Sequence, residues 1–374
     1  MKKVLAILLT FTILGAVNAH VLPKPVVKKA KIQVALLLDT SNSMDGLIDQ
    51  AKSQLWKMVN ELATSKKNNE TPDIEIALYE YGNDRLAEQE GYIRQVVPLT
   101  TDLDLLSEKL FELTTNGGSE YCGWVIEDAT LGLQWSNNND DLKIIFIAGN
   151  EPFSQGPKDF RKTCKAAISK GIIINTIHCG GFDEGINENW KEGADLADGK
   201  YMNIDQGDQV VHIPTPYDDD ILKLNQELNK TYIGYGGQGK MKAERQMAQD
   251  VNAASFGAAN ARTRASFKVK KSYNNAEWDL VDATESDGEI LESIKKEDLP
   301  EEMQNMTSKE QKEYIEKKSQ ERKVIQEKIR KLDKKAKVYI TEKQKENAER
   351  LTLDNVMIDA VREQAISKSY QFEN

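Results

Sequence analysis

Between residues 32 and 230 the chain alternates short, almost continuous apolar runs with segments of helical period. Uninterrupted runs of this length are typical of parallel strands that are covered on both faces. The apolar runs lie at 32–38, 74–79, 142–148 and 172–177. Between them, apolar residues recur at helical intervals, as in residues 47–62. The alternation predicts an α/β fold, a doubly wound, mostly parallel sheet with helices on both faces.

Shorter signals add further elements to this scheme. A strand is expected at 92–97, ended by Pro98, and Asp102 is expected to be the N-cap of the helix that follows. The other expected elements are helices at 102–113, 122–134, 157–170, 190–197 and 217–230, and a hairpin-like pair at 200–204 and 209–213. In a sheet of this kind, ligands bind at the carboxyl ends of the strands.

The charge of the chain is unevenly distributed. The formal net charge is −10. Residues 32–213 hold 30 acidic and 15 basic side chains, whereas residues 214–374 hold 30 acidic and 29 basic ones. A nucleic-acid binder normally carries a basic footprint, so this balance argues against nucleic acid as a partner. The acidic first part would instead attract cations.

The N-terminal residues have the pattern of a targeting segment. Lys2 and Lys3 precede an apolar run, and small residues follow at the positions that a signal peptidase reads, which predicts a signal peptide over 1–19. The run is shorter than the roughly 20 apolar residues that a membrane span needs. Residues 20–30 are a Pro- and Lys-rich leader, and no later segment could span a bilayer. We therefore expect an exported protein, periplasmic or secreted, with no transmembrane span after signal removal.

The three cysteines all lie in the acidic part of the chain. An exported compartment permits disulfides, so Cys122, Cys164 and Cys179 are disulfide candidates, with one bridge and one odd thiol. The sequence does not indicate which two would pair. His178 precedes Cys179, but neighbouring strand residues point to opposite faces, so this pair is a poor nucleophile and base.

The character of the chain changes after about residue 233. Residues 234–290 are expected to be a linker with an Ala-rich helix. Residues 291–350 are charge-dense, with apolar positions at helical intervals, which predicts a long amphipathic helix or helical hairpin. The alternative is an exposed, partly disordered charged segment. Residues 351–374 are the C-terminal tail, and the helices before it are candidates for self-association.

A turn rich in oxygen ligands follows the first apolar run. It contains Asp39, Ser41 and Ser43 in the pattern Asp-x-Ser-x-Ser and opens into an amphipathic helix. One carboxylate and two hydroxyls are hard ligands that suit Mg²⁺ first, with Mn²⁺ or Ca²⁺ as alternatives, rather than zinc. An acidic group from a partner could complete the metal's coordination. Asp and Ser also cap helices without any metal, so the five residues alone leave both interpretations open.

Residues 31–233 resemble the von Willebrand factor type A (VWA) domain family, which carries this turn as its metal-ion-dependent adhesion site (MIDAS). The resemblance rests on the segment from Val34 to Met44, on the Gly-Gly turn before the third long helix, on the strand order, and on the pattern Trp190…Gly193-Ala194…Ala197…Gly199…Tyr201. More narrowly, residues 116–123 and 147–152 resemble exported bacterial proteins that join this domain to a charged helical C-terminus. The resemblance implies a Rossmann-like VWA fold and a metal that captures an acidic group on a protein partner.

Two positions depart from the family's pattern. The family supplies a hydroxyl from a Thr after the Gly-Gly turn, and here Ser119 is the preferred candidate, with Thr115 and Tyr121 as alternatives. The family also has an Asp after the fourth strand. This chain has Asn150 and Glu151 there, so the implied metal set is Asp39, Ser41, Ser43, Ser119 and Glu151.

Three functions are compatible with these features, of which the first is the expected one and the hydrolase is the least expected. The first is a binding protein, without enzymatic activity, that presents a metal to a protein partner. The second is a metal-assisted hydrolase, for which Glu120 and Glu151 are the sole nearby candidates for a general base. The third is a metal-free structural protein of the envelope that oligomerises through its charged helices.

Overall fold

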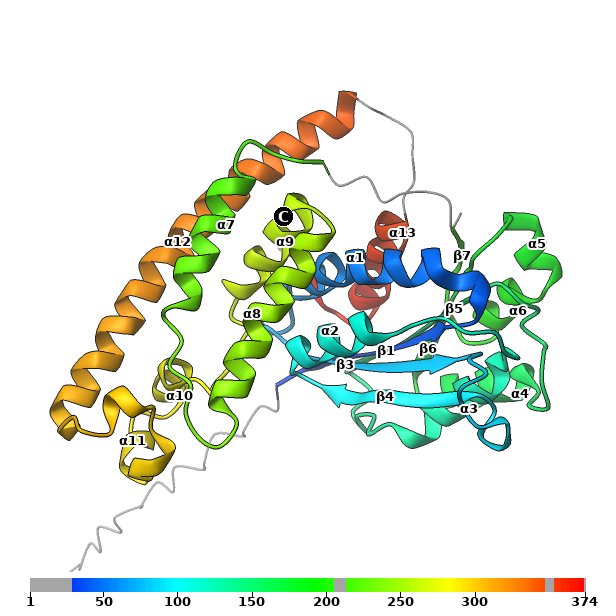
Figure 1. Cartoon of the computed structure of the whole chain (residues 1–374). Helices are drawn as coiled ribbons and strands as arrows, with labels where there is room; N and C mark the ends of the chain where they lie inside the picture. Colours follow the sequence, from blue (N-terminus) through cyan, green and yellow to red (C-terminus); the bar gives the residue numbers. More distant parts are fainter. Residues whose placement is uncertain (1–28, 205–212, 347–352, 373–374) are drawn as a thin grey trace, which may run out of the picture.

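The computed structural model describes residues 29–204, 213–346 and 353–372 (Figure 1). The signal peptide expected at 1–19, most of the leader and the second strand of the expected hairpin lie outside these residues. The main sheet has the order β4-β3-β1-β5-β6-β7, and β4 alone is antiparallel to its neighbour. Its strands are β1 (Lys31–Asp39), β3 (Asp73–Tyr81), β4 (Ile93–Thr100), β5 (Leu142–Gly149), β6 (Ile172–His178) and β7 (Tyr201–Asn203). In chain order this is 3-2-1-4-5-6, the doubly wound topology that the alternation predicts.

The central strand β1 is buried on both faces, because its side chains alternate between two cores. Leu36 and Leu38 lie in one core and Ala35 and Leu37 in the other. The first core is closed by α1 (Asp45–Leu62), α2 (Leu103–Glu112) and α13 (Leu353–Ser367). The second core is closed by α3 (Cys122–Gly132), α4 (Phe160–Ser169) and α6 (Trp190–Asp195). This double coverage explains why the central strands are predominantly apolar.

The edge strand β4 runs further than the sequence indicated. We expected Pro98 to end it, yet the strand continues to Thr100. The register between β3 and β4 shifts near Val97, so the ladder is irregular where the proline lies. Proline is tolerated on an edge strand or at a bulge because its missing N–H need not bond a second neighbour.

A layer of helices packs beside the sheet domain (Figure 1). It consists of α7 (Asp218–Asn229), α8 (Gly239–Ser255), α9 (Ala258–Lys268), α10 (Leu280–Ser286), α11 (Ile290–Ser293) and α12 (Ser308–Glu346). The helix expected at 217–230 is present as α7, but it packs on α9 and α12 rather than on the sheet. The Ala-rich segment is two helices, α8 and α9, separated at Gly257, whose φ is +100°.

The long helix of the charge-dense segment begins only at Ser308, after the short helix α11 and two 3-10 turns. The 39-residue α12 places its apolar seam, which includes Ile315 and Ile329, against other helices of the same chain. These two positions are covered within the chain, whereas Val324 and Val338 of the same helix are exposed.

The last residues are part of the sheet domain. We expected a tail over 351–374, but α13 contributes Ala360, Val361 and Ala365 to the first core. The short strand β8 (Gln371–Phe372) pairs with β2 (Ser65–Lys66), which follows α1. The chain therefore leaves the sheet domain, forms the helical layer and returns to close the sheet's open face.

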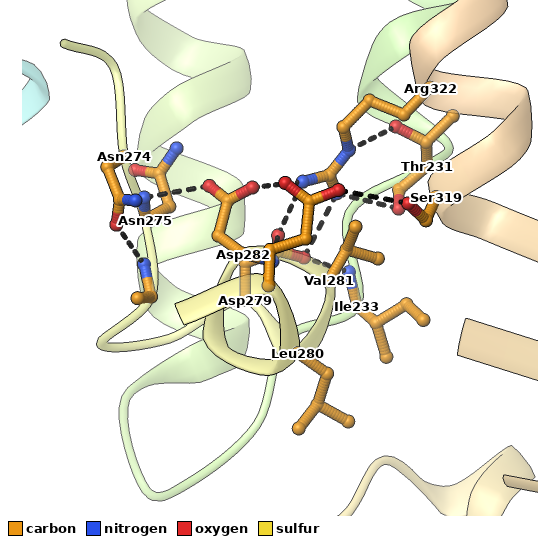
Figure 2. A network of polar contacts seen from close by, with 12 residues as sticks. Thr231, Ile233, Asn274, Asn275, Asp279, Leu280, Val281, Asp282, Ser319 and Arg322 are labelled. Carbon is orange, nitrogen blue, oxygen red and sulfur yellow. Dashed lines mark hydrogen bonds and ion pairs between the residues drawn. The ribbon is translucent and has the colours of Figure 1, made fainter. Parts of the chain in front are cut away.

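Two buried arginines hold the helical layer in place. Arg264 in α9 donates to Asp104 in α2 at 2.7 Å and to Asp250 in α8 at 2.6 Å. Figure 2 shows Arg322 of α12 between the carboxylates of Asp279 and Asp282, which it meets at 2.6 and 2.7 Å. Each arginine joins helices that are distant in sequence.

Candidate functional site

The Asp-x-Ser-x-Ser turn lies at the carboxyl end of β1, in the middle of the sheet. Asp39 is the last residue of β1 and is fully buried. The backbone N–H of Ser41 donates to its Oδ1 at 2.7 Å, which turns the chain out of the strand and into α1. Its other oxygen, Oδ2, has no hydrogen-bond partner. A buried carboxylate oxygen without a partner is costly unless a proton or a cation compensates it.

The two serines extend the site towards the neighbouring strand. The hydroxyls of Ser41 and Ser43 lie 3.2 Å apart, and that of Ser43 donates to Oδ1 of Asn150 at 3.2 Å. Asn150 follows β5, which pairs with β1. Residues from two adjacent strand ends therefore converge at one point, as the topology predicts.

Glu120 is the residue at this site that the expected metal set left out. Its side chain is buried, with 6% of its surface exposed. A Cβ at Gly82 would lie 2.8 Å from Oδ1 of Asp39 and 2.9 Å from Cγ of Glu120, so both side chains press on the backbone of Gly82. That glycine has a φ of +78°, which other residues rarely adopt. The sequence alone suggests Glu120 solely as a candidate general base.

The residues expected to supply a hydroxyl are placed differently. Ser119 is half-buried, and no described contact joins its side chain to Asp39 or Ser41. The hydroxyl of Thr115 donates to Asp45, and Tyr121 stacks on Trp124. The loop after the Gly-Gly turn thus brings a carboxylate to the site.

Glu151 contributes charge from the end of β5. Its backbone carbonyl accepts from Nε1 of Trp190 at 3.0 Å, which fixes the start of this loop. Its carboxylate raises the pKa of both Asp39 and Glu120 through repulsion. It therefore lies close enough to act on the site electrostatically.

The site holds its carboxyl groups in an unfavourable environment for negative charge. Burial, with repulsion from Glu120 and Glu151, raises the pKa of Asp39 to about 8. Burial and repulsion from Glu151 raise the pKa of Glu120 to about 7. A bound cation would reverse both effects, because it favours the ionised form. In the described part of the chain no three His, Cys, Asp or Glu side chains form a group that could hold a metal ion. A cation bound here would therefore also need the hydroxyls of Ser41 and Ser43 as ligands.

His178 and Cys179 do not form a nucleophilic pair. Nδ1 of His178 lies 3.2 Å from the carbonyl oxygen of Gly181, and Nε2 lies 3.5 Å from Glu188. Burial raises the pKa of the Cys179 thiol well above its usual value, which disfavours the reactive thiolate. The pair lies at the end of β6, and the histidine points to Glu188 rather than to the thiol.

The three cysteines are free in the structure, and all are buried. Cys122 lies 3.7 Å from the hydroxyl of Tyr81, and Cys164 is packed with it in the second core. The disulfide expected between two of the three is therefore not formed in this structure. No helix of the described residues is long and apolar enough to cross a bilayer.

Comparisons of sequence gave no relatives: no protein-family model matches the chain, and no curated protein matches it. Comparison with solved structures gave many similar folds. The VWA domain of SpRpn10 aligns with a TM-score of 0.36 and 16% identity, over 48% of this chain and 90% of that one. BatB from Bacteroides thetaiotaomicron aligns with a TM-score of 0.35 and 18% identity, over 46% and 90%.

A third similar structure is proximal thread matrix protein 1 from the mussel byssus, described with a zinc-occupied MIDAS motif. It aligns with a TM-score of 0.34 and 14% identity, over 48% of this chain and 42% of that one. The strand order of the sheet, 3-2-1-4-5-6, and the Asp-x-Ser-x-Ser turn at the end of its central strand are features of this chain itself. The sheet domain of this protein has a VWA-like fold.

Proposed function

We propose that this chain is an exported binding protein whose VWA-like domain holds a divalent cation at the carboxyl edge of the sheet and uses it to engage an acidic group on a protein partner. The observation that carries the proposal is the buried, unpartnered Oδ2 of Asp39, with two serine hydroxyls beside it. Export is proposed from the pattern of residues 1–19.

The residues present fit a hard cation. Asp39, Ser41 and Ser43 would hold it, and the carboxylates of Glu120 and Glu151 would offset its charge. A divalent cation supplies an electrophilic centre that attracts a carboxylate oxygen. Mg²⁺ is the expected ion, with Mn²⁺ or Ca²⁺ as alternatives, because all the ligands are oxygens.

The surrounding groups orient the site for such a cation and leave it accessible. The N–H of Ser41 fixes one oxygen of Asp39, which leaves the other oriented for the metal. Ser43 is exposed, so the site opens to the surface on the side where a partner would approach.

The proposal is tested by capturing partners from the envelope of the producing cell. The full mature chain and its Asp39→Ala variant are used as baits, each with Mg²⁺ and with a chelator. A specific partner should bind the wild type with Mg²⁺ and be lost with chelator and with the variant. Binding that withstands both changes would contradict a role for the metal.

A further inference from the structure

The position of Glu120 bears on how the proposed site works. Its side chain is 6% exposed and lies beside that of Asp39, because Gly82 is in contact with both. The atom of Asp39 nearest to Gly82 is Oδ1, which accepts from the backbone N–H of Ser41. Ser41 is itself an expected ligand, so Glu120 is adjacent to the cation position rather than at the rim.

The backbone around Glu120 is fixed from two sides. Its N–H donates to the side-chain carbonyl of Gln155 at 2.6 Å. A Cβ at Gly118 would lie 2.3 Å from the carbonyl oxygen of Gly82, so the preceding turn packs directly on the backbone beneath the site. This close packing holds Glu120 over Asp39.

Among the described residues no ion pair joins Glu120 to a basic side chain. The side chains that act on it electrostatically are those of Glu151 and Asp84, both acidic. A buried carboxylate is normally paired or coordinates a metal. The unpartnered Oδ2 of Asp39 lies in the same cluster, so the two carboxylates are arranged to share one cation.

We propose that Glu120 is a direct ligand of the cation, and that it closes the coordination shell where the partner's acidic group would otherwise bind. This inference rests on the proposed function, since it concerns the same metal. Together with Asp39, Glu120 neutralises a divalent ion, so the loaded site attracts a further carboxylate only when Glu120 is released. An acidic group of the partner then binds by displacing Glu120. The partner's apparent affinity equals its intrinsic affinity multiplied by the fraction of molecules in which Glu120 is released from the cation.

The number of water molecules on bound Mn²⁺ tests the inference without a known partner. Water-proton relaxation is measured on the full mature chain, its Glu120→Ala variant and an Asp84→Asn control. Asp84 is exposed and acts on Glu120 electrostatically, so the control removes a nearby negative charge and retains the ligand oxygen. The expected result is one additional exchangeable water in Glu120→Ala and none in the control.

Cation affinity gives a second readout. Glu120→Gln keeps the shape of the side chain but removes a charged ligand, so it should bind Mn²⁺ more weakly by clearly more than the roughly tenfold loss typical of a residue that only supports a ligand. It decides the matter if Glu120→Ala does not fold. Unchanged hydration in Glu120→Ala, or unchanged affinity in Glu120→Gln, would overturn the inference while leaving the proposed function intact. Failure of the wild type to bind Mn²⁺ or Mg²⁺ would instead overturn the proposed function itself.

Discussion

Arg264 in α9 donates a hydrogen bond to Asp104 in α2 at 2.7 Å, and both side chains are buried. The pair therefore links the helical layer to the sheet domain across 160 residues of sequence. Arg264 also stacks on Trp56 of α1, with its guanidinium 4.4 Å from the ring centre. The two parts of the chain should consequently unfold as one cooperative unit.

Arg264→Met should destabilise the protein by about 3–5 kcal/mol, because the change leaves the buried charges of Asp104 and Asp250 without a shared partner. The free energy of unfolding, measured in urea, gives the result. The matched control is Arg161→Met, which breaks an exposed pair with Glu192 and should cost about 1 kcal/mol or less. Equal effects of the two substitutions would contradict the structural role of Arg264.

The pair of Arg322 with Asp279 should have a local effect. Arg322 joins α12 to α10 (Figure 2). Its guanidinium also lies 4.0 Å from the ring centre of Tyr232. In Arg322→Met, amide hydrogen exchange should accelerate in α10 and α12 before it does in β1. The control is Lys323→Met, whose partner Glu285 is half exposed. Uniform acceleration through the chain would argue against a local clamp.

Stability should fall in acid through Asp250. Burial alone would raise the pKa of Asp250, but Lys268 and Arg264 hold it well below its usual range. A carboxyl with a depressed folded-state pKa contributes stability that is complete above its unfolded pKa near 4 and is lost as pH falls below it. Urea midpoints between pH 7 and pH 3 should therefore fall less steeply in Asp250→Asn than in the wild type. Parallel pH profiles would exclude this contribution.

The thiols should be inert in the native protein. Burial raises the pKa of Cys164 to about 12 and that of Cys122 still further. A thiol reagent at neutral pH should label none of the three in the folded chain and all three after unfolding without reductant. Labelling of one thiol after unfolding would instead indicate that a disulfide had formed.

The sheet was predictable because its signal is local and repeated. The alternation of Leu36 and Leu38 with Ala35 and Leu37 gives both a buried strand and its two faces. The position of the strand ends then follows from the topology of the sheet. Ser41, Ser43 and Asn150, which follow two adjacent strands, accordingly lie in contact.

The differences from expectation arise where tertiary packing decides. Ser119 and Glu120 are neighbours, and the path of the chain over Gly82 determines which one faces Asp39. The packing partners of α7 and α13 depend on the element against which each apolar stripe lies. The helical period of the sequence does not specify that element. Glu120 was recognisable by its place after the Gly-Gly turn, but the family pattern favoured a hydroxyl there.

The most direct test of the account is isothermal titration of the full mature chain with Mg²⁺. The wild type should bind one ion, and Asp39→Ala should lose this binding, because the substitution removes the one buried carboxylate with an unpartnered oxygen in the turn. Asp73 begins β3 and so lies at the other end of the parallel strands from Asp39. Asp73→Asn also removes one carboxylate and should bind Mg²⁺ as the wild type does. Equal binding by the wild type and Asp39→Ala, or binding by neither, would contradict a cation site at the end of β1.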